Sequence, residues 1–535
     1  MIKVRQAVES DVAAIHDIFM EAYRGHYAHD EFCEIGYLKK MVFDDDALVL
    51  VAEDSESGSV LGTASIILDI GAFGDLIGEF GRLVVHPDAR HRGIGKLLME
   101  GRLERVQERL HLALVENRAV HPFSQKISAA YDFVPVGFLP SKLKFAEREN
   151  VALYARAFGA CLSLRKNHPR IIPEAYPLAD RVLRDFGIRD DVIVDENTPA
   201  YPPSEPYDLE MMSSEGYASL LHFERGRVRN REILGPVKLH AGVFQLRVSH
   251  YQYLLARREG RLVGGIGFHI EPEECSARIL ELVSADDEPV RTLLEEALRG
   301  CLEDGGVKYV EVDVNAHATA MQRTLLELGF LPAAYIPAMS FHRVERLDVI
   351  RMVRLEAPID LGEVALHETT KPIADIVAHS FRGREVIPRI AAAVPRTALF
   401  AGLSDEQATR LASICNLENF CAGQEIAKLG SADGRAFLLL SGSADVTIDV
   451  SALVGSIGSG ETAGELSLIS ADHPHGATIT ASESLEAAVL DHDALTQLVR
   501  QRPDIGVIIY RNLGAQLGEK LLRANRELAN LPCSQ

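Results

Sequence analysis

The chain has 535 residues, of which 47% are hydrophobic and 25% are charged, and its formal net charge is −21. A chain of this length is too long for one hydrophobic core, so several domains are expected. The acidic balance argues against a general binder of nucleic acid or of anionic membranes. No apolar run approaches the roughly 18 residues of a membrane span. The seven cysteines form no CxxC pair, and the polar start is unlike a signal peptide, so a cytoplasmic protein with reduced thiols and no metal site is predicted.

Residues 1–150 alternate between strand and helix signals. A strand-like run is followed by an amphipathic helix that Ser10-Asp11 would cap. Later runs are typical of three strands, a helix that begins after Gly95, and a short buried strand. A strand, a glycine-rich turn, a helix and a strand in that order make a βαβ unit, so an α/β domain is predicted. The expected strands are residues 2–7, 47–53, 60–69, 79–86 and 111–115, and the apolar face of the first helix is Val12, Ile15, Ile18 and Phe19.

The segment VVHPDARHRGIGKLL, residues 84–98, lies between a predicted strand and the helix after it. Gly93 and Gly95 remove side chains at this junction, which exposes successive backbone N–H groups at the helix N-terminus. Such a turn binds pyrophosphate through amide donors and the helix dipole. Arg90, Arg92 and Lys96 add positive charge in an otherwise acidic chain. A phosphate-bearing ligand is therefore predicted, with an ordinary glycine turn and solvated arginines as the alternative.

This segment resembles the acyl-CoA loop of the GNAT family of N-acyltransferases, (Arg/Gln)-x-x-Gly-x-(Gly/Ala) after a strand that ends in Val-x-Pro. Val85-His86-Pro87 and the run from Arg90 to Gly95 match this pattern. The resemblance covers about residues 1–145 and implies a mixed α/β GNAT sheet and the use of acetyl-CoA or a similar thioester. It implies that the backbone of Leu83, Val84 and Val85 binds the pantetheine arm. The pyrophosphate would then lie against Arg90, His91, Arg92, Gly93, Ile94, Gly95 and Lys96.

Acyl transfer to an amine needs a base that takes a proton from the ammonium group, and it can use an acid for the leaving thiolate. The family often places a Glu on the strand before the loop, where this chain has Glu79, and Glu116 is a second candidate. For each, a solvated edge carboxylate is the alternative. The usual acid is a Tyr five residues before the Phe of a Gly-Phe pair, but counting back from Phe133 gives Ser128, so the chain departs from the family here. Tyr131, His121 or Ser124 could substitute, or the reaction needs no acid.

A repeat follows a proline-rich connector at residues 151–206. Residues 125–140 align without a gap with residues 322–337, at a constant offset of 197. A second, weaker match joins residues 60–69 to 262–271, in the same order, so a duplicated GNAT-like domain is predicted at 207–345. The second copy has the sequence ADDEPVRT where the loop would stand, and these acids would repel pyrophosphate. We therefore expect a degenerate copy that packs, pairs with the first copy, or shapes the substrate cleft.

The last part of the chain changes character after a linker with a helix at 346–392. Short strands punctuated by glycine fill residues 420–490, which predicts a compact β barrel or roll within a domain at 393–535. Helical patterns flank it on both sides. The sequences LSGSADVTI, with Gly442, and AGELSLISADHPHGAT resemble the cyclic nucleotide-binding domain over about residues 396–525.

In that family a Gly-Glu-(Leu/Ile) segment binds the cyclic phosphate and the ribose, and an Arg in Pro-Arg-x-Ala-(Thr/Ser) pairs with the phosphate. Gly464 and Glu465 match the first segment, and Ala477 and Thr478 match the second, but His475 stands at the arginine position. An imidazole cannot reproduce the bidentate contact of a guanidinium group. A cyclic nucleotide effector is therefore left open, and an interaction or dimerisation module is the alternative.

The sequence as a whole predicts an N-acyltransferase that moves an acetyl or similar group from acyl-CoA to an amine, with a regulatory domain that resembles cyclic nucleotide-binding domains. The acceptor could be a small amine, a polyamine or a protein lysine. No nucleic acid partner is expected, because the chain is acidic and no DNA-reading helix-turn-helix follows the β-roll. No membrane partner is expected either, because of the acidic charge and the lack of a long apolar run, and a homodimer is allowed. The alternative is a non-catalytic sensor or scaffold that binds acyl-CoA and a nucleotide. The lost Tyr and Arg favour the sensor, whereas the complete loop with Glu79 favours the enzyme.

Overall fold

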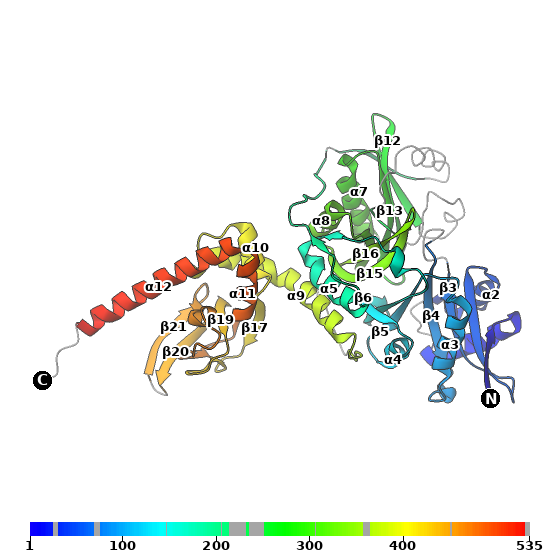
Figure 1. The fold of residues 1–535 in the computed structure, drawn as a ribbon, viewed down its shortest axis with the longest axis horizontal. Helices are drawn as coiled ribbons and strands as arrows, with labels where there is room; N and C mark the ends of the chain where they lie inside the picture. The colour runs from blue at the N-terminus through cyan, green and yellow to red at the C-terminus, as the bar shows by residue number, and fades with distance from the viewer. Residues whose placement is uncertain are drawn as a thin grey trace. The chain divides into compact units, whose positions relative to one another are not determined.

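The computed structural model describes residues 1–24, 30–68, 75–145, 147–204, 206–212, 232–234, 251–304, 306–356, 364–449 and 452–529. The chain divides into two compact units, Met1–Ser380 and Phe381–Gln535. The first unit is built on one mixed sheet flanked by helices, and the second holds two smaller sheets and its own helices (Figure 1). The predicted fold class, mixed α/β domains followed by a β-roll, is confirmed. Among the described residues, no helix is both long enough and apolar enough to cross a membrane.

The first half of the large sheet has the strand order β1-β2-β3-β4-β5-β7-β6. The central strands are apolar along nearly their whole length because helices cover both faces of the sheet. The strands are β1 Ile2–Gln6, β2 Ala47–Asp54, β3 Val60–Ile67, β4 Ile77–Val85, β5 Leu112–Arg118, β6 Val134–Lys144 and β7 Arg148–Ala157. The helices are α1 Val12–Tyr23, α2 Ile35–Phe43, α3 Ile94–Val106 and α4 Phe123–Ala130.

Helix α1 buries the apolar face that its sequence predicts, since Val12, Ile15, Ile18 and Phe19 are all buried. The predicted cap is wrong. The carboxylate of Asp11 accepts the N–H of Val8 and both terminal nitrogens of Arg5, and it makes no capping bond to α1. The guanidinium group on β1 offers two charge-assisted donors, which outweigh one amide donor of the helix.

Strands β4 and β5 separate part-way along their length. They pair as parallel strands only from Ile77 to Phe80 on β4 and from Leu112 to Val115 on β5, although β4 continues to Val85 and β5 to Arg118. On its other side, β4 carries an irregularity in its pairing with β3. Arg82 lies in this irregular stretch with a left-handed φ of 51°, as expected for a β-bulge that bends the strand. The two strand ends therefore part and leave their facing edges open.

The second half of the sheet repeats the first in reverse, with the order β15-β16-β14-β13-β12-β11-β10. Strands β13 and β14 are parallel, as β4 and β5 are. The halves meet where β6 pairs with β15 at Gly137 and Ala334, which are equivalent residues of the repeat (Figure 1). A Cβ atom on Gly137 would lie 2.2 Å from that of Ala334, so this contact requires glycine. The strands are β10 Asp208–Met211, β11 Tyr251–Arg258, β12 Arg261–Glu271, β13 Ser276–Ser284, β14 Tyr309–Asn315, β15 Leu331–His342 and β16 Glu345–Leu355, and the helices are α7 Glu288–Arg299 and α8 Thr319–Glu327.

The segments between the predicted domains contain regular structure. The predicted connector 151–206 begins inside β7 and then forms β8 Arg170–Ile171, α5 Tyr176–Asp185 and β9 Ile193–Val194. The predicted linker 346–392 begins inside β16 and ends in α9 Lys371–Ala393. Strand β16 differs from a usual buried strand because Arg346, Asp348 and Arg351 are buried on it. Asp348 pairs with Arg165 and Arg351 pairs with Asp313. Arg346 instead donates to the carbonyl oxygens of Asp75, Ala338 and Met339.

The second unit contains two four-stranded sheets, β17-β24-β19-β22 and β18-β23-β20-β21. Phe437, Leu439, Ile479 and Val489 belong to one core between them. Gly442 forms the turn from β19 to β20 with a φ of 80°, where a Cβ atom would lie 2.6 Å from a carbonyl oxygen. The strands are β17 Asn416–Phe420, β18 Glu425–Ala427, β19 Arg435–Ser441, β20 Ser443–Asp449, β21 Ala452–Gly458, β22 Thr462–Ala463, β23 Thr478–Ala481 and β24 Leu485–Asp491, and the helices are α10 Asp405–Ala412, α11 His492–Gln501 and α12 Pro503–Ala529.

Candidate functional site

A cavity of about 160 Å³ lies where β4 and β5 part. Both strands, α3, α4 and the end of β6 contribute to its wall, so the separation of two parallel strands creates the space. Its apolar lining includes Phe80, Leu83, Met99, Val115 and Ile127. Its polar lining consists of Tyr23, Glu79, Arg82, Arg102, Glu116, Asn117, Arg118, His121, Ser124 and Ser128. All three predicted catalytic residues, Glu79, Glu116 and Ser128, therefore reach one cavity.

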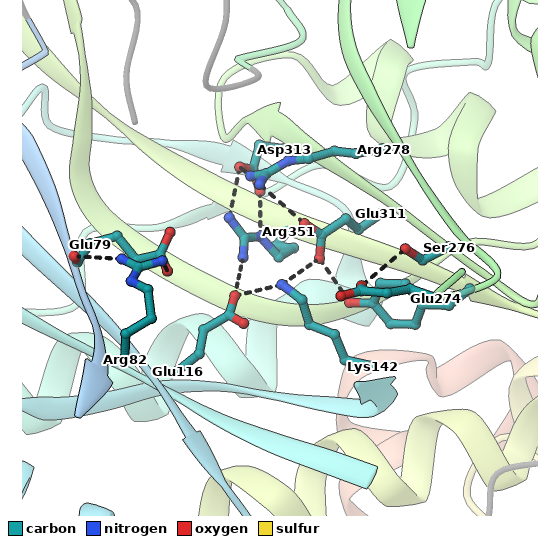
Figure 2. Close-up of polar contacts among 11 residues, drawn as sticks. Glu79, Arg82, Glu116, Lys142, Glu274, Ser276, Arg278, Glu311, Asp313 and Arg351 are labelled. Carbon is teal, nitrogen blue, oxygen red and sulfur yellow. Dashed lines mark hydrogen bonds and ion pairs between the residues drawn. The ribbon is translucent and has the colours of Figure 1, made fainter. Parts of the chain in front are cut away.

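Glu79 lies on β4 with about a third of its side chain exposed. Its Oε1 accepts a hydrogen bond from Nη1 of Arg82 at 3.2 Å, and Nε of Arg82 donates to Oγ of Ser65 at 2.6 Å. Figure 2 shows this pair apart from the larger group around Glu116. The Glu79 carboxylate is thus oriented by a neighbouring cation and remains accessible to solvent, as a general base must be.

Glu116 lies on β5 and is held in a buried ion-pair network (Figure 2). Its Oε1 accepts from Nζ of Lys142 at 2.5 Å and lies 3.6 Å from Nη1 of Arg351. Lys142 also pairs with Glu311 at 3.2 Å. Burial alone would lower the pKa of Lys142, but the carboxylates of Glu116 and Glu311 outweigh burial and raise that pKa. The charge of Glu116 is therefore neutralised by two cations.

Ser128, at the position of the family tyrosine, is fully buried. Its Oγ accepts from Nδ2 of Asn117 at 3.0 Å, so Asn117 fixes the hydroxyl group. Of the other candidate acids, Tyr131 donates to the carbonyl oxygen of Lys96 in an exposed position outside the cavity lining. His121 and Ser124 do line the cavity. Burial and the charge of Arg118 lower the pKa of His121, so its imidazole is neutral at pH 7.

The predicted phosphate loop leads into α3. Gly93 is the residue before the helix and has a left-handed φ of 77°, and the side chains of Arg90, His91 and Lys96 are exposed around it. The first amide groups of a helix have no partner within it. At the start of α3 the N–H groups of Lys96 and Leu97 already donate to the carbonyl oxygen of Gly93, so the amides of Ile94 and Gly95 are the ones that a ligand could use. Leu83, Val84 and Val85 form the end of β4, beyond its last pair with β5. Their facing edge is therefore free to bind a ligand.

Two residues of the loop have additional roles. A guanidinium nitrogen of Arg92 lies 3.3 Å from Oδ2 of Asp54, so part of its charge is neutralised by β2. A Cβ atom on Gly95 would lie 2.9 Å from Cδ1 of Ile127. Gly95 therefore allows α3 to pack closely on α4, and because Ile127 also lines the cavity, this contact joins the loop to the cavity wall.

A second cavity, of about 300 Å³, lies in the β-roll. Four of the five residues predicted there line it, namely Gly464, Glu465, His475 and Ala477. Thr478 begins β23 outside the lining, where its Oγ1 accepts the N–H of Leu429 at 3.1 Å. Gly464 has a left-handed φ of 72° directly before the short helix Glu465–Leu468.

His475 is buried against this turn. A Cβ atom on Gly464 would lie 3.0 Å from Cε1 of His475, so the imidazole fills the space beside the glycine. Its Nε2 lies 2.8 Å from a carboxylate oxygen of Asp433. Nε2 is therefore engaged by a carboxylate, whose negative charge beside the turn opposes phosphate binding.

Two family models match the chain in the regions just described. The model described as "Acetyltransferase (GNAT) domain" matches residues 45–127, and the one described as "Cyclic nucleotide-binding domain" matches residues 417–502. The chain therefore contains a GNAT domain and a cyclic nucleotide-binding domain. The GNAT match includes Glu79, the loop at Arg90–Lys96 and Glu116, and the second match includes Gly464 and His475.

Individual relatives each cover less than a third of the chain. Glutaminase 2 of Bradyrhizobium diazoefficiens is 25% identical over 131 residues, which are 24% of this chain and 21% of that protein, so the chain spans about a fifth of its length. A phosphinothricin acetyltransferase from Sinorhizobium meliloti, solved with AcCoA, is 21% identical and covers 30% of this chain and 89% of its own, with a TM-score of 0.27. A ribosomal-protein-alanine N-acetyltransferase from Brucella melitensis is 22% identical (29% and 99% covered, TM-score 0.26). A cyclic nucleotide-binding domain from Methylobacillus flagellatus is 22% identical (28% and 86%, TM-score 0.25).

The cavity of the GNAT domain contains a buried cation that the sequence patterns did not single out. Arg102 on α3 is 1% exposed and donates to the carbonyl oxygens of Ser65 and Gly81, both at 3.2 Å. Its guanidinium carbon lies 5.0 Å from the centre of the Phe80 ring. A sequence signal exists, because Arg102 lies four residues after Leu98 and four before Val106, on the helical face that the apolar spacing predicts to be buried.

In the second half, the segment equivalent to the loop is residues 285–292, and it contains no glycine. Strand β13 leads through Asp286 and Asp287 into α7, which begins at Glu288. A side-chain oxygen of Asp286 accepts the N–H of Glu288 at 3.1 Å. An acidic side chain therefore binds an amide at the start of α7, whereas the first turn of α3 contains no acidic residue.

Proposed function

We propose that the GNAT domain transfers an acetyl or similar acyl group from acyl-CoA to an amine, with Glu79 as the base. The observation that carries this proposal is the position of Glu79 in a cavity between the parted ends of β4 and β5, whose wall residue Ile127 touches the phosphate loop at Gly95. This arrangement joins an anion-binding helix start to a partly exposed carboxylate.

The loop and the open edge of β4 would bind acyl-CoA. The amides at the start of α3 and the charges of Arg90 and Lys96 would hold the pyrophosphate. The unpaired edge of β4 at Leu83 and Val85 offers backbone donors and acceptors to the amide groups of pantetheine. Acyl-CoA would supply the activated acyl group, and the side chains of the cavity would orient the amine.

Glu79 would take the proton that the ammonium group must lose before its nitrogen can attack the thioester carbonyl. The new C–N bond forms as the C–S bond breaks, the products are an amide and CoA thiol, and one proton is released in total. The chain has Ser128 where the family has its tyrosine acid, and Asn117 donates a hydrogen bond to that hydroxyl group. The leaving thiolate would then be protonated by solvent.

The experiment is turnover of acetyl-CoA by the full chain against a panel of amines, with Glu79→Gln and Glu116→Gln compared. Loss of a general base lowers the rate by about 10²–10⁴-fold, so Glu79→Gln should lose turnover on that scale while it still binds acetyl-CoA. Wild-type turnover in Glu79→Gln would show that another group is the base. Binding of acetyl-CoA without turnover of any amine would favour a sensor or scaffold, which the replacement of the tyrosine by Ser128 also favours.

We infer that the cyclic nucleotide-binding domain regulates the transferase and that cyclic nucleotides bind it weakly. The contact between His475 and Asp433 supports this inference, because it leaves the phosphate only the amides near Gly464 and Glu465.

We infer further that the second half is a degenerate copy that shapes the cavity of the first. Arg351 and Glu311, which fix Glu116 and Lys142, both come from this second half.

A further inference from the structure

The charges around the cavity of the GNAT domain do not balance. Arg118 is paired with Glu149 through two hydrogen bonds, and Glu116 is neutralised by Lys142. Arg82 pairs with Glu79. Arg102 remains, and within the described ranges of the chain it has no ion pair. The lining therefore carries one positive charge more than its carboxylates neutralise.

Arg102 is buried at a cost. Its Nη1 binds two carbonyl oxygens, but its Nε has no hydrogen-bond partner. Burial, and then the nearby charge of Arg82, lower the pKa of Arg102 to about 9, so the guanidinium group is still charged at pH 7. A buried charge without a counter-ion is unfavourable, and a carboxylate bound beside it would relieve both the unpaired charge and the repulsion from Arg82.

The part of the cavity wall near the start of α4 also has unsatisfied polar atoms. Nδ1 of His121 and Oγ of Ser124 are buried without a hydrogen-bond partner, and both residues lie at the start of α4 or just before it. Buried polar atoms in folded proteins nearly always have a partner. Two parts of the cavity wall thus present polar atoms that a polar ligand would satisfy.

We propose that the amine acceptor of the GNAT domain is an amino acid, whose carboxylate binds between Arg82 and Arg102 and whose ammonium group binds Glu79. Oε1 of Glu79 and Nη1 of Arg82 lie 3.2 Å apart. The ammonium and carboxylate groups of an amino acid have a similar spacing, so the ammonium group can face Glu79 while the carboxylate faces Arg82. A protein lysine or a polyamine carries no carboxylate beside its reactive amine. This inference rests on the proposed acyl transfer and names its substrate class.

The first test compares the twenty amino acids with matched amines that lack the carboxylate, such as leucine with leucinamide and isoamylamine. The full chain and acetyl-CoA are used, and release of CoA is followed. At least one amino acid should have a kcat/KM more than ten times that of its amide and its amine. Equal values, or a preference for the amines, would overturn the inference but leave the acyl transfer intact. A protein that does not bind acetyl-CoA would instead count against the proposed function.

A second arm distinguishes the source of the carboxylate. Succinyl-CoA carries a carboxylate on its acyl group, so it is offered with the same uncharged amides and amines. If this combination is turned over faster than acetyl-CoA with any amino acid, the arginines bind the acyl group, and the inference about the acceptor is wrong. If acetyl-CoA with an amino acid is faster, the inference is supported.

The variant test uses Arg102→Gln, with Arg105→Gln on the same helix as its matched control, since Arg105 lies outside the cavity lining. Calorimetry measures binding of the preferred amino acid in the presence of CoA. Arg102→Gln should weaken it at least tenfold, and Arg105→Gln less than twofold. If Arg102→Gln does not fold, Arg82→Gln tests the other cation and should lower the preference for amino acid over amide at least tenfold. Unchanged affinity or preference in the folded variants would overturn the inference.

Discussion

Gln125 and Gln322 occupy equivalent places in the two halves of the first unit, 197 residues apart, and both are fully buried. Nε2 of Gln125 donates to the carbonyl oxygen of Ala365 at 3.2 Å, in the segment that follows the second half. Oε1 of Gln322 accepts the N–H of Ile172 at 3.0 Å, in the segment that follows the first half. Each half therefore holds the chain that leaves the other, which explains why both form a single unit.

Gln125→Leu and Gln322→Leu should each destabilise this unit. Each substitution leaves buried backbone groups without a partner, at a cost of about 1–3 kcal/mol per group. Unfolding in urea should show a lower midpoint for both variants. The exposed Gln107 provides the control, and Gln107→Leu should unfold as the wild type does. If all three variants have the wild-type midpoint, the segments at Ala365 and Ile172 do not depend on these side chains for their stability.

The two glutamines belong to the part of the fold that the sequence predicts. The gapless repeat that begins at Gln125 predicts the duplication. The turn at Gly93 lies between β4 and α3, in the strand-turn-helix order that the sequence predicts. The partners of buried charges were not predictable, because they are far apart in the chain. Lys142 meets Glu311 across 169 positions, and the spacing along either strand contains no trace of this pair. Arg102 was missed because a cation in an apolar helical face is ordinarily assigned to the surface.

Gly93→Glu should abolish binding of acetyl-CoA. The added side chain would meet no protein atom within 4 Å of its Cβ, but its carboxylate would repel the pyrophosphate at the helix start. Calorimetry should show a Kd raised at least 100-fold. Gly187 has a similar left-handed φ of 69° and open surroundings, so Gly187→Glu carries the same backbone strain without the electrostatic effect. Equal affinity in the two variants would refute the placement of the pyrophosphate.

Acetyl-CoA should bind with one site per chain. The helix start of the second half is acidic, and Asp286 already binds the N–H of Glu288 there. The same titration of the wild type gives the stoichiometry directly. Two equivalent sites would show that the second half is not degenerate.

Lys142→Met should destabilise the first unit most strongly near neutral pH. The substitution removes the cation between Glu116 and Glu311, and breaking a buried ion pair costs about 3–5 kcal/mol. Burial alone would raise the pKa of Glu311, but Lys142 and two arginines outweigh it and hold that pKa well below its usual range.

The pH dependence follows from the direction of that shift. A carboxylate with a lowered pKa stabilises the fold above the pKa of the unfolded chain, about 4.3, and loses this contribution as the pH falls toward the folded value. The difference in unfolding free energy between wild type and Lys142→Met should therefore shrink as the pH falls below about 4.3. Lys144 is exposed on the same strand, and Lys144→Met should show neither effect. A difference that does not change with pH would contradict the assigned role of Glu311.

His475→Arg should strengthen cyclic nucleotide binding only when Asp433 is also replaced. A guanidinium group can pair bidentately with a phosphate, but the Asp433 carboxylate, 2.8 Å from Nε2 of His475, would compete for it. The single variant should therefore gain little, whereas His475→Arg with Asp433→Ser should bind a fluorescent cyclic nucleotide at least ten times more tightly than the wild type. Adding Gly464→Ala should remove this gain, because a Cβ atom there would lie 2.7 Å from the carbonyl oxygen of Arg435. If the double variant binds no nucleotide, the missing arginine is not what limits this pocket, and the domain would instead act through contact with another protein surface.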